Sequence, residues 1–239
     1  MQTLMPKPAL FAAAALLALS VAAHADLKVT QTTRIDNPQL KAYVETMTPQ
    51  QRAAMSRGGG MMAGLMPSKT TVYFSGRKTR ADIGQTTLLY DGATHKIVTL
   101  NRAAHTYTAR PYSGAAGAGQ FQATVKPVGG IKTIQGHPAR HYLMTATNAS
   151  LPGTIIQGDI WAAQDLPSPP SLSGGGPLAA TQSLLNKIKG YPLIASIVAT
   201  GSPMGNTTFK STVTSVSKAA LPASTFAIPA GYKKAAAAQ

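Results

Sequence analysis

Cysteine is absent from this chain of 239 residues. Its absence excludes disulfide bonds, zinc–thiolate sites, iron–sulfur clusters and a cysteine nucleophile. Carboxylates are scarce, with 7 Asp and Glu against 22 Lys and Arg, which leaves little material for paired-carboxylate catalysis. Aromatic residues make up only 6% of the chain, which disfavours the mixed aromatic and basic platforms that bind single-stranded nucleic acid. We therefore expect no nucleic-acid partner.

The first 25 residues are typical of a secretory signal peptide. Lys7 precedes an apolar run from Ala9 to Ala23, and Ala23-His24-Ala25 predicts cleavage after Ala25. The run is shorter than the ~20 apolar residues that a membrane-spanning helix needs. No cysteine is present for lipid attachment. We therefore expect a periplasmic or secreted protein with no transmembrane segment after cleavage.

The remaining chain has the composition of a globular protein with a strong positive charge. Hydrophobic residues make up 44% of the sequence, which is enough to build a core. Its length predicts a single domain over residues 26–232, followed by a disordered tail over residues 233–239. The net charge of +15 can attract an anionic envelope surface, or it can reflect adaptation to an acidic medium in which carboxylates would be protonated.

Two helical segments interrupt a chain that otherwise has strand character. Asn37-Pro38 is a helix start, and the stripe Leu40, Tyr43, Val44 and Met47 has helical spacing. A capping box formed by Thr48 and Gln51 restarts the helix after a bend at Pro49, so we predict two short helices over residues 38–56. A further helix is predicted over residues 178–189, ending at Gly190.

Alternating and Thr-rich segments separated by turn residues predict about ten or eleven strands. Their connections are mostly short, which favours antiparallel pairing, and a sheet of this size curls or splits. The predicted fold class is mainly β (α+β), with a strongly curved antiparallel sheet or half-open β-barrel whose concave face is covered by the helical inserts. The segments with strand character lie within residues 27–34, 70–75, 78–83, 86–90, 96–100, 105–110, 121–126, 131–134, 140–147, 154–163, 193–200 and 207–218.

Five of the nine methionines, at positions 47, 55, 61, 62 and 66, fall within twenty residues. Thioethers suit Cu(I), so copper binding is one interpretation. No histidine or cysteine accompanies the cluster, and methionine also suits adaptable apolar surfaces. We therefore favour a hydrophobic lid hinged at Gly58-Gly59-Gly60.

Catalytic motifs are lacking. His137 and His141 are four residues apart on a predicted strand, about 13 Å by strand rise, which is too far for one metal ion. The chain has neither a Gly-x-Ser-x-Gly elbow nor a phosphate-binding loop ending in Gly-Lys-Ser/Thr. We therefore predict no enzyme activity, no catalytic residue, no metal and no cofactor.

Several short motifs over residues 70–232 resemble a known type of exported protein. They are Tyr90-Asp91-Gly92, the Gly136 to Tyr142 stretch, the strand around Trp161 with its following Asp165-Leu166-Pro167, and the closing segment 226–232. The chain resembles an uncharacterised exported bacterial domain family similar to the LolA/LolB-like lipoprotein-carrier fold. That resemblance implies a half-open barrel with a helical lid over a hydrophobic cavity. The missing lipidated cysteine and the Gly-rich stretches at 58–60 and 113–119 depart from it.

Together these observations predict a soluble periplasmic, non-enzymatic binding or carrier protein for a hydrophobic or lipid-like ligand such as an acyl chain. The alternative is a structural or interaction module of the cell envelope, with a basic face and no ligand cavity. Copper handling ranks below both. The residues that we expect in the lid or pocket are Tyr43, Met47, Met61, Met62, Met66, Trp161 and Leu184.

Overall fold

A computed structural model of the chain describes residues 26–51, 68–112, 121–148, 153–168, 188–201 and 205–235. The predicted signal peptide, Met61, Met62, Met66 and Leu184 lie outside these residues. The elements, in chain order, are β1 (Leu27–Asp36), α1 (Pro38–Thr46), β2 (Ser68–Ser75), β3 (Lys78–Ile83), β4 (Thr86–Asp91), β5 (Lys96–Asn101), β6 (Thr106–Pro111), β7 (Phe121–Ile134), β8 (His137–Asn148), β9 (Ile155–Ala163), β10 (Tyr191–Thr200), β11 (Thr207–Lys218), the 3-10 helix η2 (Ala223–Phe226) and β12 (Lys233–Lys234).

All of the described strands belong to one 12-stranded sheet, in the order β12-β6-β5-β4-β3-β2-β1-β11-β10-β9-β8-β7. Neighbouring strands pair antiparallel, except that the short β12 runs parallel to β6. Most neighbours in the sheet are also neighbours in sequence. The exceptions are β12, which pairs with β6, and β1, which lies between β2 and β11 and so joins the two halves of the sheet.

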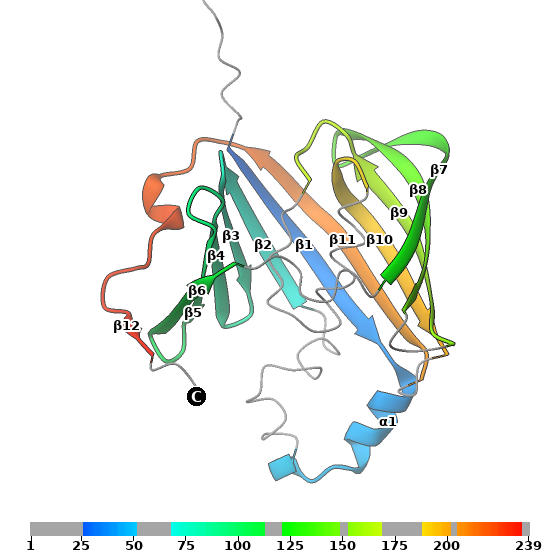
Figure 1. The fold of residues 1–239 in the computed structure, drawn as a ribbon, viewed down its shortest axis with the longest axis horizontal. Coiled ribbons are helices and arrows are strands. Elements are labelled where there is room, and N and C mark those ends of the chain that lie inside the picture. Colours follow the sequence, from blue (N-terminus) through cyan, green and yellow to red (C-terminus); the bar gives the residue numbers. More distant parts are fainter. Residues whose placement is uncertain are drawn as a thin grey trace, which may run out of the picture.

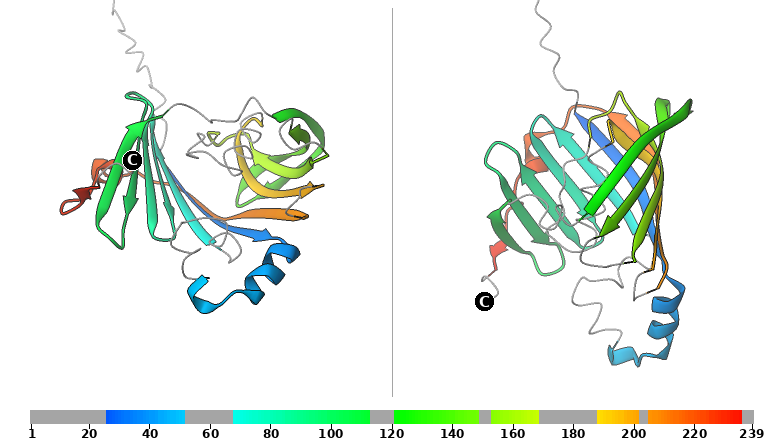
Figure 2. Two further views of the ribbon diagram at one scale, coloured as in Figure 1. Left: turned by 60° about the horizontal axis from the view of Figure 1, so that its bottom comes forward. Right: turned by 45° about the vertical axis from the view of Figure 1, so that its right-hand side comes forward.

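The sheet is strongly curved and open, as predicted, and it does not close into a barrel (Figure 1). Figure 2 shows strands β3–β6 rising as one wall and β7–β10 as the other, with β2, β1 and β11 between them. Register shifts at Thr30/Gln31 of β1 against β11, and at Pro192/Ile194 of β10 against β9, add local bends. Such irregularities increase the twist of a strand pair, which helps the sheet to curl.

The hairpin turns follow from the sequence, with one difference. Ser75 pairs with Lys78 and Asp91 with Lys96, as Gly76-Arg77 and Asp91-Gly92 predict. Gly129 and Gly130, however, do not separate two strands. They lie in an irregularity within the single strand β7, which shifts register against β8 between Pro127 and Ile131, and Gly130 has a φ of +84°.

Helix α1 begins as the sequence predicts. Asn37 is the N-cap, and its side-chain oxygen accepts a hydrogen bond of 2.8 Å from the backbone N–H of Leu40. The reciprocal bonds of the capping box are also present between Thr48 and Gln51. The helix lies beyond the end of β1 (Figure 1), where the Asn37 amide donates to the Thr207 hydroxyl. Most of the further helix that we predict over residues 178–189 lies outside the described residues.

The C-terminal segment packs on the outside of the β3–β6 wall (Figures 1 and 2). Arg80 on β3 donates to the Thr225 carbonyl at 3.1 Å and also forms an ion pair with Asp82 at 3.0 Å. The backbone N–H of Lys233 bonds the His105 carbonyl at 3.0 Å. Residues 233 and 234, which we expected in a disordered tail, instead form β12, because the free edge of β6 supplies hydrogen-bond partners.

Candidate functional site

The inner side of the curved sheet is the candidate site, and one part of it is filled by side chains. Phe74 on β2 and Tyr191 on β10 form an edge-to-face pair with ring centroids 5.9 Å apart, although β1 and β11 separate their strands in the sheet. The Tyr191 hydroxyl also donates to the Gln31 side-chain carbonyl at 3.2 Å. Because the ring contact crosses two intervening strands and the hydroxyl contact crosses one, the sheet must curl around them.

This pair belongs to an apolar cluster that joins both halves of the sheet. Its buried members are Leu27, Val29, Val72, Phe74, Ala81, Ala139, Ala163, Leu166, Tyr191, Leu193 and Val213. A second cluster follows β7–β11 and contains Tyr142, Met144, Ala146, Ile156, Ile160, Ala162, Ile188, Ala195 and Ile197. The sheet is thus lined with apolar side chains over much of its length, and the first cluster is packed by the protein itself.

Two of the predicted lid residues lie on or just after α1. Tyr43 has 60% of its surface exposed, and Met47, the C-cap residue, is half-buried. Leu40 is the one residue of α1 that is buried. The apolar stripe of this helix is therefore only partly covered.

Trp161, also predicted in the site, lies on β9 in a stack of aromatic and charged groups. Its ring is parallel to that of His141 on β8, with centroids 4.4 Å apart and an interplanar angle of 1°. The ammonium of Lys132 on β7 lies 3.9 Å from the Trp161 ring centroid. The Nε2 atom of His141 lies 3.1 Å from a carboxylate oxygen of Asp159. This nitrogen is buried, and it forms no hydrogen bond with the described residues. Three strands are thus joined through one indole ring.

A second histidine–carboxylate pair lies where β8 begins and β9 ends. His137 Nδ1 is 2.7 Å from Asp165 Oδ2, and the ammonium of Lys218 is 3.9 Å from the same oxygen. The sequence did not reveal this contact, because the two residues are 28 positions apart. Such a pair can orient an imidazole for proton transfer, but it also fastens two turns together. Among the described residues, no group of three His, Asp or Glu side chains could hold a metal ion.

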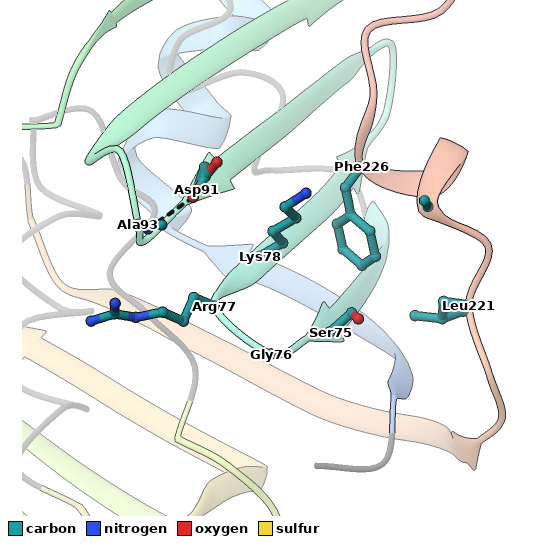
Figure 3. Close-up of a pocket in the computed structure, with 9 residues that line it drawn as sticks. Ser75, Gly76, Arg77, Lys78, Asp91, Ala93, Leu221 and Phe226 are labelled. Carbon is teal, nitrogen blue, oxygen red and sulfur yellow. Dashed lines mark hydrogen bonds between the residues drawn. The ribbon is translucent and has the colours of Figure 1, made fainter. Parts of the chain in front are cut away.

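An open pocket of about 340 Å³ lies between the β2–β3 turn, the β4–β5 turn and the C-terminal segment. Figure 3 shows the residues that line it. Lys78 and Phe226 flank it, and Ser75 and Leu221 form its lower side in this view. Hydrogen bonding by the Ala93 backbone N–H at 2.8 Å is the main cause that holds the pKa of Asp91 below its usual value. The pocket therefore combines an ionised carboxylate, a cation and an apolar edge.

The carboxylates of the described residues are largely used inside the structure. Asp26, Asp82, Asp91, Asp159 and Asp165 each contact a backbone N–H, an arginine, a histidine or a lysine. Among the lysines and arginines of the described residues, only Arg80 and Lys218 form ion pairs with a carboxylate. Most of the positive charge is therefore not neutralised locally.

An open, curved and mainly antiparallel sheet with an apolar lining defines the fold class. The chain belongs to the family described as domain of unknown function (DUF4412), whose model matches residues 61–232. This match confirms the prediction of an uncharacterised domain family. No curated protein matches the sequence. Within the described residues, no helix has the length and apolar character needed to cross a bilayer.

Two solved structures are distantly similar to this chain. One is a LolA superfamily protein from Nitrosomonas europaea, with 8% identity, a TM-score of 0.33, and coverage of 85% of this chain and 90% of that one. The other is a domain from Vibrio parahaemolyticus provisionally described as an outer membrane lipoprotein-sorting protein, with 9% identity, a TM-score of 0.33, and coverage of 84% and 89%.

Proposed function

We propose that this chain is a non-enzymatic periplasmic carrier that holds a hydrophobic or lipid-like ligand against the inner side of its curved sheet. An open, curved sheet can present an apolar lining to a ligand on its concave side. The second core cluster supplies such a lining over β7–β11, whereas the first is packed by the protein's own side chains. The signal peptide predicted from the sequence supports the location.

The observation that carries the proposal is the incompletely buried apolar stripe of α1. Leu40 anchors the helix, while Tyr43 is 60% exposed and Met47 is half-buried. Surface helices normally direct such a stripe at a protein core. A stripe that the described part of the chain covers only partly can instead close over an apolar ligand, and methionine adapts well to ligands of varied shape. Trp161, Met61, Met62, Met66 and Leu184 remain our predictions for the rest of the pocket.

The histidine–carboxylate pairs are consistent with a carrier. His141 is stacked on Trp161, and His137 joins the turns at the ends of β8 and β9. In both places the imidazole is held by neighbouring strands and fastens them together. A structural role therefore accounts for both pairs, and the proposal assigns neither of them a catalytic one.

Native mass spectrometry of protein purified gently from the periplasm tests the proposal, together with displacement of a fluorescent fatty-acid probe. We expect a ligand-bound species and displaceable probe binding. The double variant Tyr43→Ser/Met47→Ser should weaken probe binding about tenfold, because it removes apolar contact area. The variant Lys41→Ser/Glu45→Ser is the matched control on exposed positions of the same helix, and it should bind the probe like the unmodified protein.

Ligand-free protein that also fails to bind the probe would contradict the carrier function. That outcome would favour the alternative predicted from the sequence, an envelope module with a solid interior. Equal loss of probe binding in both double variants would show that α1 does not contact the ligand through its apolar stripe.

A further inference from the structure

Four exposed cations share one face of the neighbouring strands β2, β1 and β11. They are Lys28 and Arg34 on β1, Lys69 on β2 and Lys210 on β11, and we call them the cationic face. Lys28 and Arg34 are an even number of residues apart on β1, so they point to the same side. Lys210 is directly opposite Arg34, and Lys69 is directly opposite Thr32, which precedes Arg34 on that side of β1.

The register places like charges beside one another. Arg34 and Lys210 are direct cross-strand partners, and Lys69 is a diagonal neighbour of Arg34. Like charges in directly opposite positions destabilise a sheet. Asp36 is the one carboxylate in these three strands, and it lies on the same side as Arg34, at the end of β1 and diagonal to Lys210. Four cations against one carboxylate leave this face with an excess of positive charge, which an anionic partner would neutralise.

The cations are spread out rather than convergent. Lys28 and Arg34 are about 20 Å apart along β1 by strand rise, and the three strands span about 10 Å across. A single phosphate needs donors that converge on one point. An array of separate charges instead matches phosphates that are displayed on a plane. Exposed hydroxyls of Thr32 and Thr212 lie between the cations and can donate hydrogen bonds to such phosphates.

An aromatic ring free to stack on sugars would favour a polysaccharide partner instead. Tyr73, on the same face, has the Lys28 ammonium 5.6 Å and the Arg80 guanidinium 5.7 Å from its ring centroid. The ring is half-buried and already contacts two cations.

We propose that the cationic face docks the protein on the phosphate headgroups of an anionic lipid bilayer. This inference goes beyond the carrier proposal and does not depend on it.

Sedimentation with vesicles tests the inference. Purified protein is mixed with vesicles of phosphatidylcholine, either alone or with phosphatidylglycerol. We expect binding to the anionic vesicles only, weakening as salt is added. Each cation near a charged bilayer contributes roughly fivefold to binding, so Arg34→Gln/Lys69→Gln/Lys210→Gln should bind on the order of 100-fold more weakly. The single variant Lys210→Gln should lose roughly fivefold.

The matched control removes three exposed cations elsewhere on the sheet, in the variant Lys96→Gln/Arg110→Gln/Lys234→Gln. It has the same net charge as the triple variant and should keep most of the binding. Equal loss in both triple variants would overturn the proposal in favour of a diffuse charge effect. Failure of the unmodified protein to bind anionic vesicles would also overturn it, as would binding through these cations to a soluble anionic polysaccharide alone. The triple variant should still bind the fatty-acid probe, which separates this result from the carrier test.

Discussion

Tyr191 holds the two halves of the curved sheet together, and replacing it tests how the fold is maintained. Its side chain is 3% exposed, contacts Phe74 edge-to-face at 5.9 Å, and donates to Gln31 at 3.2 Å. Tyr191→Ala removes the ring and leaves a cavity in the first core cluster. Tyr191→Phe keeps the ring and removes only the hydroxyl.

The expected magnitudes differ between these variants. Loss of a buried aromatic side chain costs about 3–5 kcal/mol of unfolding free energy, so we expect that cost for Tyr191→Ala. A single neutral hydrogen bond contributes about 1 kcal/mol, so Tyr191→Phe should be mildly destabilising. The contact between Phe74 and Tyr191 should give a coupling energy of about 0.5–1.5 kcal/mol in a double-mutant cycle.

Urea unfolding followed by circular dichroism measures these values in Tyr191→Ala, in Tyr191→Phe, in Phe74→Ala and in the double variant Phe74→Ala/Tyr191→Ala. Tyr43→Ala, which truncates a tyrosine with 60% of its surface exposed, is the control and should change stability by less than about 0.5 kcal/mol. A cost below about 1 kcal/mol for Tyr191→Ala, or a coupling energy near zero, would show that the ring pair does not hold the sheet in its curved form.

The same residue predicts a loss of stability at high pH. Burial raises the pKa of the Tyr191 hydroxyl well above its usual value. The unfolded chain therefore loses this proton near pH 10 while the folded chain keeps it, and the free energy of unfolding falls as the pH rises further. Tyr191→Phe should be less sensitive to pH in this range. An identical alkaline dependence in both proteins would contradict the assignment to Tyr191.

Three further changes probe local structure. The backbone N–H of Leu221 bonds Asp26 at 2.6 Å and holds its pKa below the usual value, so this contact should weaken only as the pH falls below about 4. Asp26→Asn should abolish that acid dependence in protease digestion of the C-terminal segment. Gly190→Ala should cost more than about 2 kcal/mol in urea unfolding, because φ is +97° and a Cβ atom would meet the Ala163 carbonyl. Asn37→Ala removes the N-cap of α1 and should cost about 1 kcal/mol in the same assay, and an unchanged midpoint would refute the role of the cap.

Local features of the fold could be predicted because they depend on neighbouring residues. The cap at Asn37, the capping box of Thr48 and Gln51, and the turns at Gly76 and Asp91 all act within about four residues. Short connections between Thr-rich segments were also enough to predict a curved antiparallel sheet. The prediction of two separate strands around Gly129 and Gly130 was wrong, because a glycine pair suits both a turn and a β-bulge. Only the pairing of β7 with β8 distinguishes these two possibilities.

The site was less predictable because it depends on residues that are far apart in sequence. Trp161 was expected in the pocket, but its stacking on His141 and its contact with Lys132 arise only when β7, β8 and β9 are brought into register. The contact of His137 with Asp165 has the same origin. The cationic face likewise depends on β1 lying between β2 and β11, although β11 is far from both in the chain.

The amino-acid sequence by itself determined the charge excess, the helix start at Asn37, the approximate positions of most strands, and the exclusion of thiol chemistry, because composition and short-range hydrogen bonding need no partner from elsewhere in the chain. Tertiary structure alone decided which side chains meet. Strand order and register are set by long-range pairing and by the bends that bulges introduce, and these placed Phe74 on Tyr191, Arg34 beside Lys210, and β12 on the edge of β6.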